Sequence, residues 1–334
     1  MVSEAQVSEY LRQHPLPDMS DPISVRREPA DFSGQRFHVS AGTSACTLKT
    51  YEPSAQESAK REAAGLKLAG NMGLSPELLR DDESGALLGG PILIAEAPSG
   101  EPLGTARMTD QNVQDWLFLL LTLHHLPADV ASFPSSMSPD AGTWWRRTQA
   151  SWEACKALYT TGRYKPLMDV LTKLHAIVGA RIEARRDLWN NVARRPCHGN
   201  PVPASLFNTG KRLMLTEWEG FGQGDIAMEF ARAAGLAALS GDLDANQYVH
   251  FVADYLAGMR DLRDTTLEDR IQVFASVLPL GFCFVMMSVL AEDKQATADE
   301  RDARIAQVER ALTWIHDTLG VELGNVEMLV APLA

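Results

Sequence analysis

Cysteine is scarce in this sequence, and no two cysteines stand close together. The 334 residues include four cysteines, at Cys46, Cys155, Cys197 and Cys283. None belongs to a Cys-x-x-Cys pair, so neither a zinc site nor a thiol redox motif is expected. Scattered thiols without a disulfide framework are typical of a reducing compartment.

Positive charge is also in deficit. The chain has 31 lysines and arginines against 43 aspartates and glutamates, and its formal net charge is −12. Proteins that bind nucleic acid usually carry a basic patch and a high pI, so we expect no nucleic-acid partner. An acidic surface suits a cationic small substrate, but it also simply keeps a protein soluble, and it selects no substrate.

Long apolar runs are nearly absent. One uncharged stretch, from Val273 to Ala291, is just long enough to cross a bilayer. Pro279 and Gly281 interrupt its middle, so we interpret it as two buried helical pieces that meet there, not as a membrane span. The N-terminus has neither the basic nor the apolar segment of a signal peptide. We therefore expect a cytoplasmic protein with no membrane contact.

The hydrophobic pattern changes about a third of the way along the chain. An opening helix over residues 1–22 precedes short alternating segments that are typical of strands. The expected strands cover residues 23–28, 36–40, 45–51, 78–80, 86–88 and 91–97, and one helix covers residues 54–71. Amphipathic helices predominate afterwards, at residues 112–126, 144–158, 167–186 and from 225 onward, with a strand-like insertion over residues 196–216.

This order predicts an α+β fold with two lobes. The small lobe, residues 1–97, would hold an antiparallel sheet with a leading helix. The larger lobe, residues 98–334, would be mostly helical. The Pro/Gly-rich stretch 98–102 is expected to link them.

The most informative stretch begins at His198-Gly-Asn200. Ser205 follows, then a hairpin with its turn at Asn208–Gly210, then Glu217-Trp-Glu219, and finally Gly224-Asp225. In order and spacing this stretch resembles the catalytic region of the aminoglycoside phosphotransferase/choline kinase family, a branch of the protein-kinase-like fold.

Three positions depart from the family pattern. Asn200 stands where the family has its catalytic aspartate, Ser205 where it has a metal-binding asparagine, and Glu217 where it has a metal-binding aspartate. An amide cannot accept a proton, and the loss of a general base typically costs about 10²–10⁴ in rate. The longer Glu217 side chain would displace a magnesium ion that demands near-ideal octahedral geometry.

The resemblance extends toward the N-terminus. Lys49 fits the strand lysine that holds the nucleotide phosphates, and Glu62 on the next helix fits its acidic partner. Gly34, in a hairpin from Phe32 to Phe37, fits the segment that covers the phosphates, and the backbone of Glu96 and Ala97 fits the edge that holds adenine. Taken singly, Lys49 would be interpreted as an ordinary strand lysine that points to solvent, and Glu62 is compatible with a surface acid on an exposed helix face.

The resemblance implies ATP and Mg²⁺ as cofactors. By this resemblance Lys49, Glu62, Gly34, Glu96 and Ala97 would bind the nucleotide. Ser205 and Glu217 would hold the metal, and Asn200 would occupy the degenerate position of the base. His198 and Asp225 are assigned structural roles, His198 bracing the loop and Asp225 capping the following helix.

Two functions remain open at this point. One is an ATP-dependent kinase that phosphorylates a hydroxyl of an unidentified small molecule, because a loose phosphoryl-transfer transition state needs little help from a base. The other is a pseudokinase that binds nucleotide or acts as a scaffold, because all three metal and base positions are altered. The sequence identifies neither the acceptor nor the oligomeric state, and no residue indicates antibiotic resistance.

Overall fold

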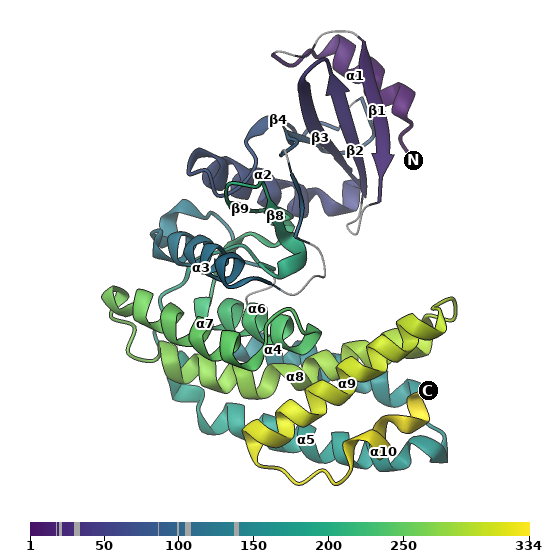
Figure 1. Ribbon diagram of the computed structural model, residues 1–334, viewed down its shortest axis with the longest axis vertical. Coiled ribbons are helices and arrows are strands. Elements are labelled where there is room, and N and C mark those ends of the chain that lie inside the picture. Colours follow the sequence, from purple (N-terminus) through teal and green to yellow (C-terminus); the bar gives the residue numbers. More distant parts are fainter. Residues whose placement is uncertain are drawn as a thin grey trace. The chain divides into compact units, whose positions relative to one another are not determined.

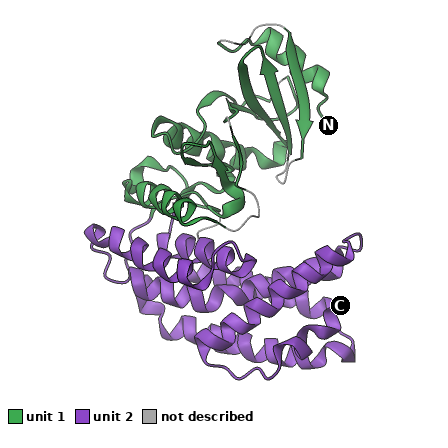
Figure 2. Ribbon diagram, in the orientation of Figure 1, with its two compact units in different colours: residues 1–137, 195–223 green, residues 138–194, 224–334 purple. Residues whose placement is uncertain are grey.

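The structure is a computed structural model that describes residues 1–17, 19, 22–29, 34–85, 87–98, 100–103, 108–136 and 140–334. The chain divides into two compact units, each made of two segments of the sequence. Unit 1 is Met1–Met137 with Arg195–Gln223, and unit 2 is Ser138–Arg194 with Gly224–Ala334 (Figure 2). The expected lobe boundary at residues 97–98 falls within unit 1 and stays a prediction.

A five-stranded antiparallel sheet forms the N-terminal part of unit 1 (Figure 1). Its strands lie in the order β1-β2-β3-β5-β4. Their bounds are Ile23–Glu28 for β1, Gly34–Ala41 for β2, Ser44–Tyr51 for β3, Leu78–Asp82 for β4 and Ile92–Glu96 for β5. The expected strand over residues 86–88 is wrong: Leu87 and Leu88 lie in a turn, and Ala86 is outside the described residues.

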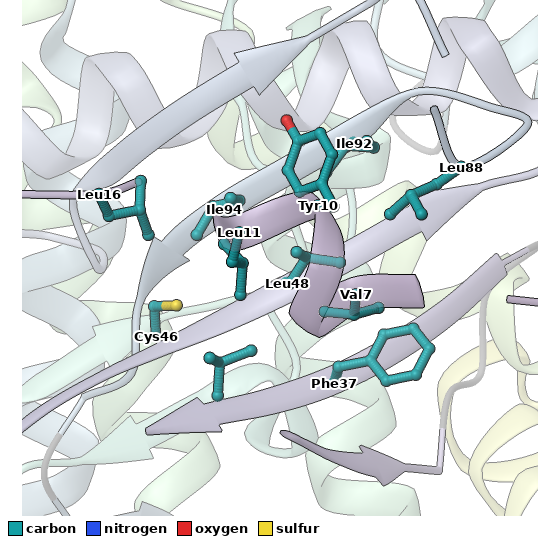
Figure 3. Close-up of a cluster of buried hydrophobic side chains, with 11 residues drawn as sticks. Val7, Tyr10, Leu11, Leu16, Phe37, Cys46, Leu48, Leu88, Ile92 and Ile94 are labelled. Atoms are coloured by element: carbon teal, nitrogen blue, oxygen red, sulfur yellow. The ribbon is translucent and has the colours of Figure 1, made fainter. Parts of the chain in front are cut away.

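Alternation along the strands separates the two faces of this sheet. Strand β2 buries every second residue, Phe37 and Val39 among them. Helix α1 (Glu4–Gln13) packs on this face through Val7, Tyr10 and Leu11, and the apolar cluster they form is drawn in Figure 3. The intervening residues of β2 and β3 therefore point to the opposite face.

Helix α2 (Gln56–Asn71) follows the short 3-10 turn η1 (Pro53–Ala55). It packs against η6 (Trp218–Gly220), and the contact depends on Gly65. A Cβ atom at Gly65 would lie 2.7 Å from the indole of the fully buried Trp218. Because Gly65 follows Glu62 by less than one helical turn, this close approach holds the α2 face that bears Glu62 against η6.

A Gly65→Ala substitution tests this contact. We expect overpacking against the rigid indole to cost about 1–3 kcal/mol, which exceeds the roughly 1 kcal/mol that alanine gains in helix propensity. Urea unfolding measures the loss. Gly235→Ala in α6 is the matched control, because a Cβ at this position would meet nothing within 4 Å, and it should be neutral or stabilising. Equal effects of the two substitutions would contradict the close contact.

The rest of unit 1 contains short strands and one long helix. Strand β6 (Glu101–Pro102) pairs with β8 (Leu206–Asn208), which pairs with β9 (Leu213–Leu215). The end of the expected linker is thus part of a small sheet. The remaining elements are α3 (Asp110–His125), η2 (Ala128–Val130), β7 (Arg195–Cys197), η5 (Pro203–Ser205) and β10 (Gly222–Gly224).

Unit 2 is built mainly from helices. They are α4 (Ala141–Leu158), α5 (Lys165–Ala184), α6 (Ile226–Ser240), α7 (Ala245–Gly258), α8 (Leu267–Glu292), α9 (Ala298–Leu319) and α10 (Val326–Val330). The 3-10 turns η3 (Gly162–Tyr164), η4 (Arg186–Trp189), η7 (Arg260–Leu262) and η8 (Ala331–Leu333) connect or extend them.

The long apolar stretch forms one helix, so the expected pair of helical pieces is wrong. Helix α8 continues through Pro279. A proline removes one backbone hydrogen bond, and here burial of α8 against α4, α6 and α9 on both sides of Pro279 outweighs that loss. By length and composition α8 passes the test for a membrane-crossing helix, yet 56% of its most apolar window is buried inside the fold, as in the core helix of a globular protein.

A buried ion network fixes the start of α6 in unit 2. Asp225 caps the helix by accepting a hydrogen bond from the Ala227 N–H at 2.9 Å. The fully buried Arg270 lies 3.2 Å from Asp225 and 2.8 Å from Asp264, and the indole of Trp189 donates to Asp225 at 3.2 Å. This is the structural role that the sequence assigns to Asp225.

Asp264 makes the stability of the chain depend on acid pH. Burial raises the pKa of Asp264, but the hydrogen bond and the charge of Arg270 together lower it by more. The pKa of Asp264 in the folded chain is therefore below the usual value. The stabilisation is therefore present above about pH 4, the unfolded pKa, and is lost as the pH falls. An Asp264→Asn variant should be less stable than the original at pH 5, and the difference should shrink toward pH 2.5.

Urea unfolding at several pH values measures this difference. Asp169→Asn, which removes an exposed pair with Lys165 on α5, should change stability by less than about 0.5 kcal/mol throughout. A destabilisation by Asp264→Asn that stayed constant from pH 5 to pH 2.5 would contradict the assignment.

Candidate functional site

Strands β1, β2 and β3 bring charged side chains together on the sheet face opposite α1. Glu28 pairs with Arg36 across β1 and β2, and Arg36 pairs with Lys49 across β2 and β3. Side chains at paired positions share one face of a sheet. These three residues therefore form one row across the sheet, and the row brings Arg36 beside Lys49.

Lys49 is the centre of the site. Its buried ammonium donates to Glu62 at 2.7 Å, to Glu219 at 2.8 Å and to Glu217 at 2.9 Å. An ammonium has three N–H donors, and here three carboxylates accept from it. Lys49 and Glu62, which the resemblance pairs as a lysine and its acidic partner, are thus in direct contact.

Two further side chains complete the cluster. The Tyr51 hydroxyl, two residues after Lys49 on β3, donates to Glu62 and lies 3.4 Å from Glu219. The guanidinium of Arg36 forms an ion pair with Glu217. Two cations therefore face three carboxylates in a largely buried space.

Glu217 adopts an unusual backbone conformation. With φ at 65° and ψ at 62° it lies in the left-handed region that a non-glycine residue seldom occupies. Such a conformation costs about 1–3 kcal/mol and persists only when its surroundings hold it. Here the ion pairs with Lys49 and Arg36 hold the side chain that this backbone directs toward β2 and β3.

The cluster sets the protonation of its members. Burial lowers the pKa of Lys49, but the carboxylates raise it by more, so the ammonium stays charged. For Glu219, burial raises the pKa, and the attraction and hydrogen bond of Lys49 lower it to about 2. Burial raises the pKa of Glu62 and Glu217 above their usual range, and Lys49 offsets this only in part.

A tightly hydrogen-bonded loop lies beside the cluster. The His198 ring packs against Trp218 with centroids 4.4 Å apart, and its Nε2 lies 2.8 Å from the Thr216 carbonyl oxygen. Its Nδ1 accepts from the Asn200 N–H at 3.2 Å, so these partners place the proton on Nε2. Gly199, with φ at 100°, passes so close to Gly220 that a Cβ would lie 2.5 Å away. His198 therefore braces the loop that presents Asn200.

A pocket of about 470 Å³ opens beside the cluster. Lys49, Glu62 and Glu217 line it together with Arg26, Arg36 and His38, and its apolar lining includes Leu93, Ala95, Leu206 and Phe207. A pocket with one apolar wall and one group of charges is of the kind that binds a small ligand with a flat apolar part and a charged part.

The sequence matches the family described as "Phosphotransferase enzyme family" over residues 24–265. The chain belongs to this phosphotransferase family. The match covers most of the chain and includes every residue of the cluster. A comparison with curated proteins finds no match.

Solved structures show the same fold at low identity. An aminoglycoside phosphotransferase from Alicyclobacillus acidocaldarius matches with a TM-score of 0.62 and 15% identity, covering 96% of each chain. A choline kinase from Cryptosporidium parvum matches with a TM-score of 0.63 and 14% identity over 95% of each chain. Choline kinase LicA from Streptococcus pneumoniae has a TM-score of 0.57 and 14% identity, over 94% of this chain and 99% of LicA.

The predicted α+β, protein-kinase-like fold is therefore confirmed, with an antiparallel sheet lobe and a larger helical part. Sequence identity of 14–15% to these solved structures establishes the fold of this chain. The activity of the chain must be argued from its own residues.

The predicted adenine-binding residues lie at the end of β5. Glu96 and Ala97 line the pocket. Their N–H groups donate to carbonyl oxygens of the fold, that of Glu96 to Glu77 at 2.9 Å and that of Ala97 to Ala45 at 3.2 Å. Gly34 starts β2 and is absent from the described lining of this pocket, while Phe32 of the expected hairpin lies outside the described residues.

The predicted metal ligands do not form a set that fits magnesium. Arg36 occupies one carboxylate oxygen of Glu217 and Lys49 occupies the other. The buried hydroxyl of Ser205 has one proton to donate, and two carbonyl oxygens of its own loop lie within reach, that of Asn200 at 2.9 Å and that of Val202 at 2.7 Å. Magnesium takes oxygen ligands in near-ideal octahedral geometry. Because both carboxylate oxygens of Glu217 already have cationic partners, the arrangement in this family member disagrees with the metal site that the resemblance implies.

Sequence reasoning missed Arg36 and Tyr51 as members of the site. Tyr51 carries a signal that could have found it, because it follows Lys49 by two residues on one strand. Residues two apart on a strand share a face. Arg36 is set opposite Lys49 by the register of β2 with β3, which the structure supplies.

Proposed function

We propose that this chain is a small-molecule kinase of the cytoplasm, which binds ATP in the pocket and transfers the terminal phosphoryl group to a hydroxyl. One observation carries the proposal: the buried Lys49–Glu62 pair, 2.7 Å apart, lines a pocket that also has apolar side chains, Leu93, Leu206 and Phe207 among them. A lysine held by an acid is the phosphate clamp of kinase-like folds. LicA, which shares the fold, is known in complex with AMP, and this supports nucleotide binding.

Each part of the pocket has a role in this proposal. The adenine ring would lie against Leu93, Leu206 and Phe207, near the backbone of Glu96 and Ala97. The phosphates would lie toward Lys49, which Glu62 holds in position when Glu217 and Glu219 give way to phosphate oxygens. A charged ammonium attracts phosphate strongly in a partly buried site.

Asn200 would orient the acceptor. Its amide oxygen can accept a hydrogen bond from a hydroxyl, although it cannot take the proton away. Phosphoryl transfer passes through a loose transition state in which positioning and charge neutralisation do most of the work. Slow transfer without a general base is therefore consistent with these residues.

The acceptor is proposed as a small molecule because the solved relatives act on such compounds, among them aminoglycosides and choline according to their descriptions. The net charge of −12 gives no reason to expect a nucleic acid. It is compatible with a cationic acceptor such as an amino sugar or a quaternary amine.

A second function is favoured by a specific observation. The amide of Asn200 cannot act as a general base, and both carboxylate oxygens of Glu217 are paired with cations of the chain, Arg36 and Lys49. Both features suit a pseudokinase that binds nucleotide without transferring phosphate. The two functions share nucleotide binding and differ only in turnover.

Incubation of the purified protein with ATP and a panel of amino sugars, amino alcohols and macrolides separates them. Phosphorylated product, detected by mass spectrometry above a heat-treated control, supports the kinase. ATP-dependent thermal stabilisation without product supports the pseudokinase. The absence of any ATP effect on melting would overturn both.

A further inference from the structure

The sheet face that lines the pocket carries three permanent cations, and the acids Glu62, Glu96 and Glu217 line the rest of the pocket. Two rows cross β1, β2 and β3: Arg26 pairs with His38 and His38 with Thr47, while Glu28 pairs with Arg36 and Arg36 with Lys49. All six residues line the pocket. Glu28 accepts from Arg26 at 3.0 Å, and Glu28 is the one acid among the six.

We propose that Arg36 replaces the divalent metal ion in this chain, so that nucleoside phosphates bind to the pocket without magnesium. The inference rests on the nucleotide binding of the proposed function and adds that Arg36, in place of Mg²⁺, neutralises the phosphates.

The contact of Arg36 with Glu217 is the first support. Glu217 stands where the family has its metal-binding acid, and a guanidinium of this chain is bound to it. Arg36 is largely buried, with 22% of its side chain exposed, so its charge is fixed in the pocket. A divalent ion at Glu217 would meet Arg36 and Lys49 at close range, and both would repel it.

The chemistry of the guanidinium is the second support. Arginine stays charged at any working pH and offers a planar fork of N–H groups that matches carboxylate and phosphate oxygens alike. A side chain that holds a carboxylate can therefore hold a phosphate oxygen when a nucleotide enters the pocket. Phosphate would replace Glu217 as the partner of Arg36, with Arg26 and His38 on the adjoining row.

The loop of Ser205 is the third support. Its hydroxyl makes its hydrogen bonds to backbone carbonyls inside the loop, so the second predicted ligand is held by the chain itself. The substitutions at Ser205 and Glu217 both affect metal binding. If Arg36 on β2 neutralises the phosphates, neither position has to bind a metal.

The test on the unaltered protein is ATP binding by titration calorimetry, once with Mg²⁺ and once with EDTA. We expect the two dissociation constants to agree within about threefold. Binding that occurs with Mg²⁺ and disappears in EDTA would overturn this inference and leave the proposed function intact. Failure to bind ATP under either condition would overturn both.

Variants then assign the effect to Arg36. We expect Arg36→Ala to weaken ATP binding in EDTA by at least about tenfold and to gain a dependence on Mg²⁺, because Glu217 is released. Arg36→Lys, which keeps the charge, should recover part of the affinity. Arg27→Ala is the matched control: it removes the same charge from β1, on a side chain that lies against Met1 and does not line this pocket.

Circular dichroism and melting temperature verify that each variant is folded. If Arg36→Ala is folded and binds ATP in EDTA as tightly as Arg27→Ala does, Arg36 does not replace the metal.

Discussion

Replacing Lys49 with alanine is expected to weaken ATP binding by about 10- to 100-fold, which corresponds to the 1.5–3 kcal/mol of a hydrogen bond to a charged group. It should also destabilise the fold by about 3–5 kcal/mol, because the removal of one partner of a buried ion pair is strongly destabilising. The partner left behind is Glu62, which is buried and bonded to Lys49 and Tyr51, and without Lys49 it must lack a counter-charge or take up a proton. Calorimetric titration and urea unfolding measure the two effects.

A double variant separates binding from folding. Lys49→Met with Glu62→Gln removes both charges of the buried pair, so we expect most of the lost stability to return while ATP binding stays weak. Lys60→Ala is the control for a general loss of positive charge, since Lys60 is partly exposed and lies 3.8 Å from Glu83. Normal ATP affinity in the stabilised double variant would remove Lys49 from the nucleotide site.

Replacing Asn200 with aspartate is expected to raise ATP-dependent phosphoryl transfer or hydrolysis by about 10²–10⁴-fold, the usual contribution of a general base. The loop around residue 200 is already held by His198 and by the close approach of Gly199 to Gly220. The new carboxylate would therefore occupy the position that the resemblance assigns to the base. Initial rates of ADP release, measured with and without an acceptor, test the expectation.

Asn208→Asp on the neighbouring hairpin is the matched control for this change. Asn208 accepts a hydrogen bond from the Gly210 N–H, which an aspartate can also accept, and we expect no change in rate. If Asn200→Asp is folded, binds ATP and shows no gain in rate, the missing base does not limit transfer. The altered surroundings of Glu217 would then explain slow turnover.

Local patterns predict much of this fold. Alternation in β2 and β3 separates Phe37 and Leu48, which enter the core, from Lys49, which faces the pocket. The period of two residues carries this information directly. The contact of Lys49 with Glu62 is expected from the resemblance to the kinase family, not from a local pattern. Asp225 caps α6 as its position before an apolar helix indicates.

Other features depend on contacts that no local pattern encodes. Arg36 and Glu217 are 181 residues apart in the sequence, and their pairing requires both the β2–β3 register and the left-handed backbone of Glu217. Pro279 predicts a break, yet burial on both sides keeps α8 continuous. In both cases tertiary packing overrides the local preference.

The division into units has a consequence for dissecting this protein. Each unit is assembled from two separate stretches of sequence, and the chain passes from one unit to the other at residues 137–138, 194–195 and 223–224 (Figure 2). No single cut releases a whole unit: a fragment that stops at residue 137 lacks β8 and β9, and with them His198, Glu217 and Glu219. Lys49 can therefore meet all three of its acids only after synthesis has passed residue 219. A chain that stops at residue 137 carries Lys49 and Glu62 without Glu217 and Glu219.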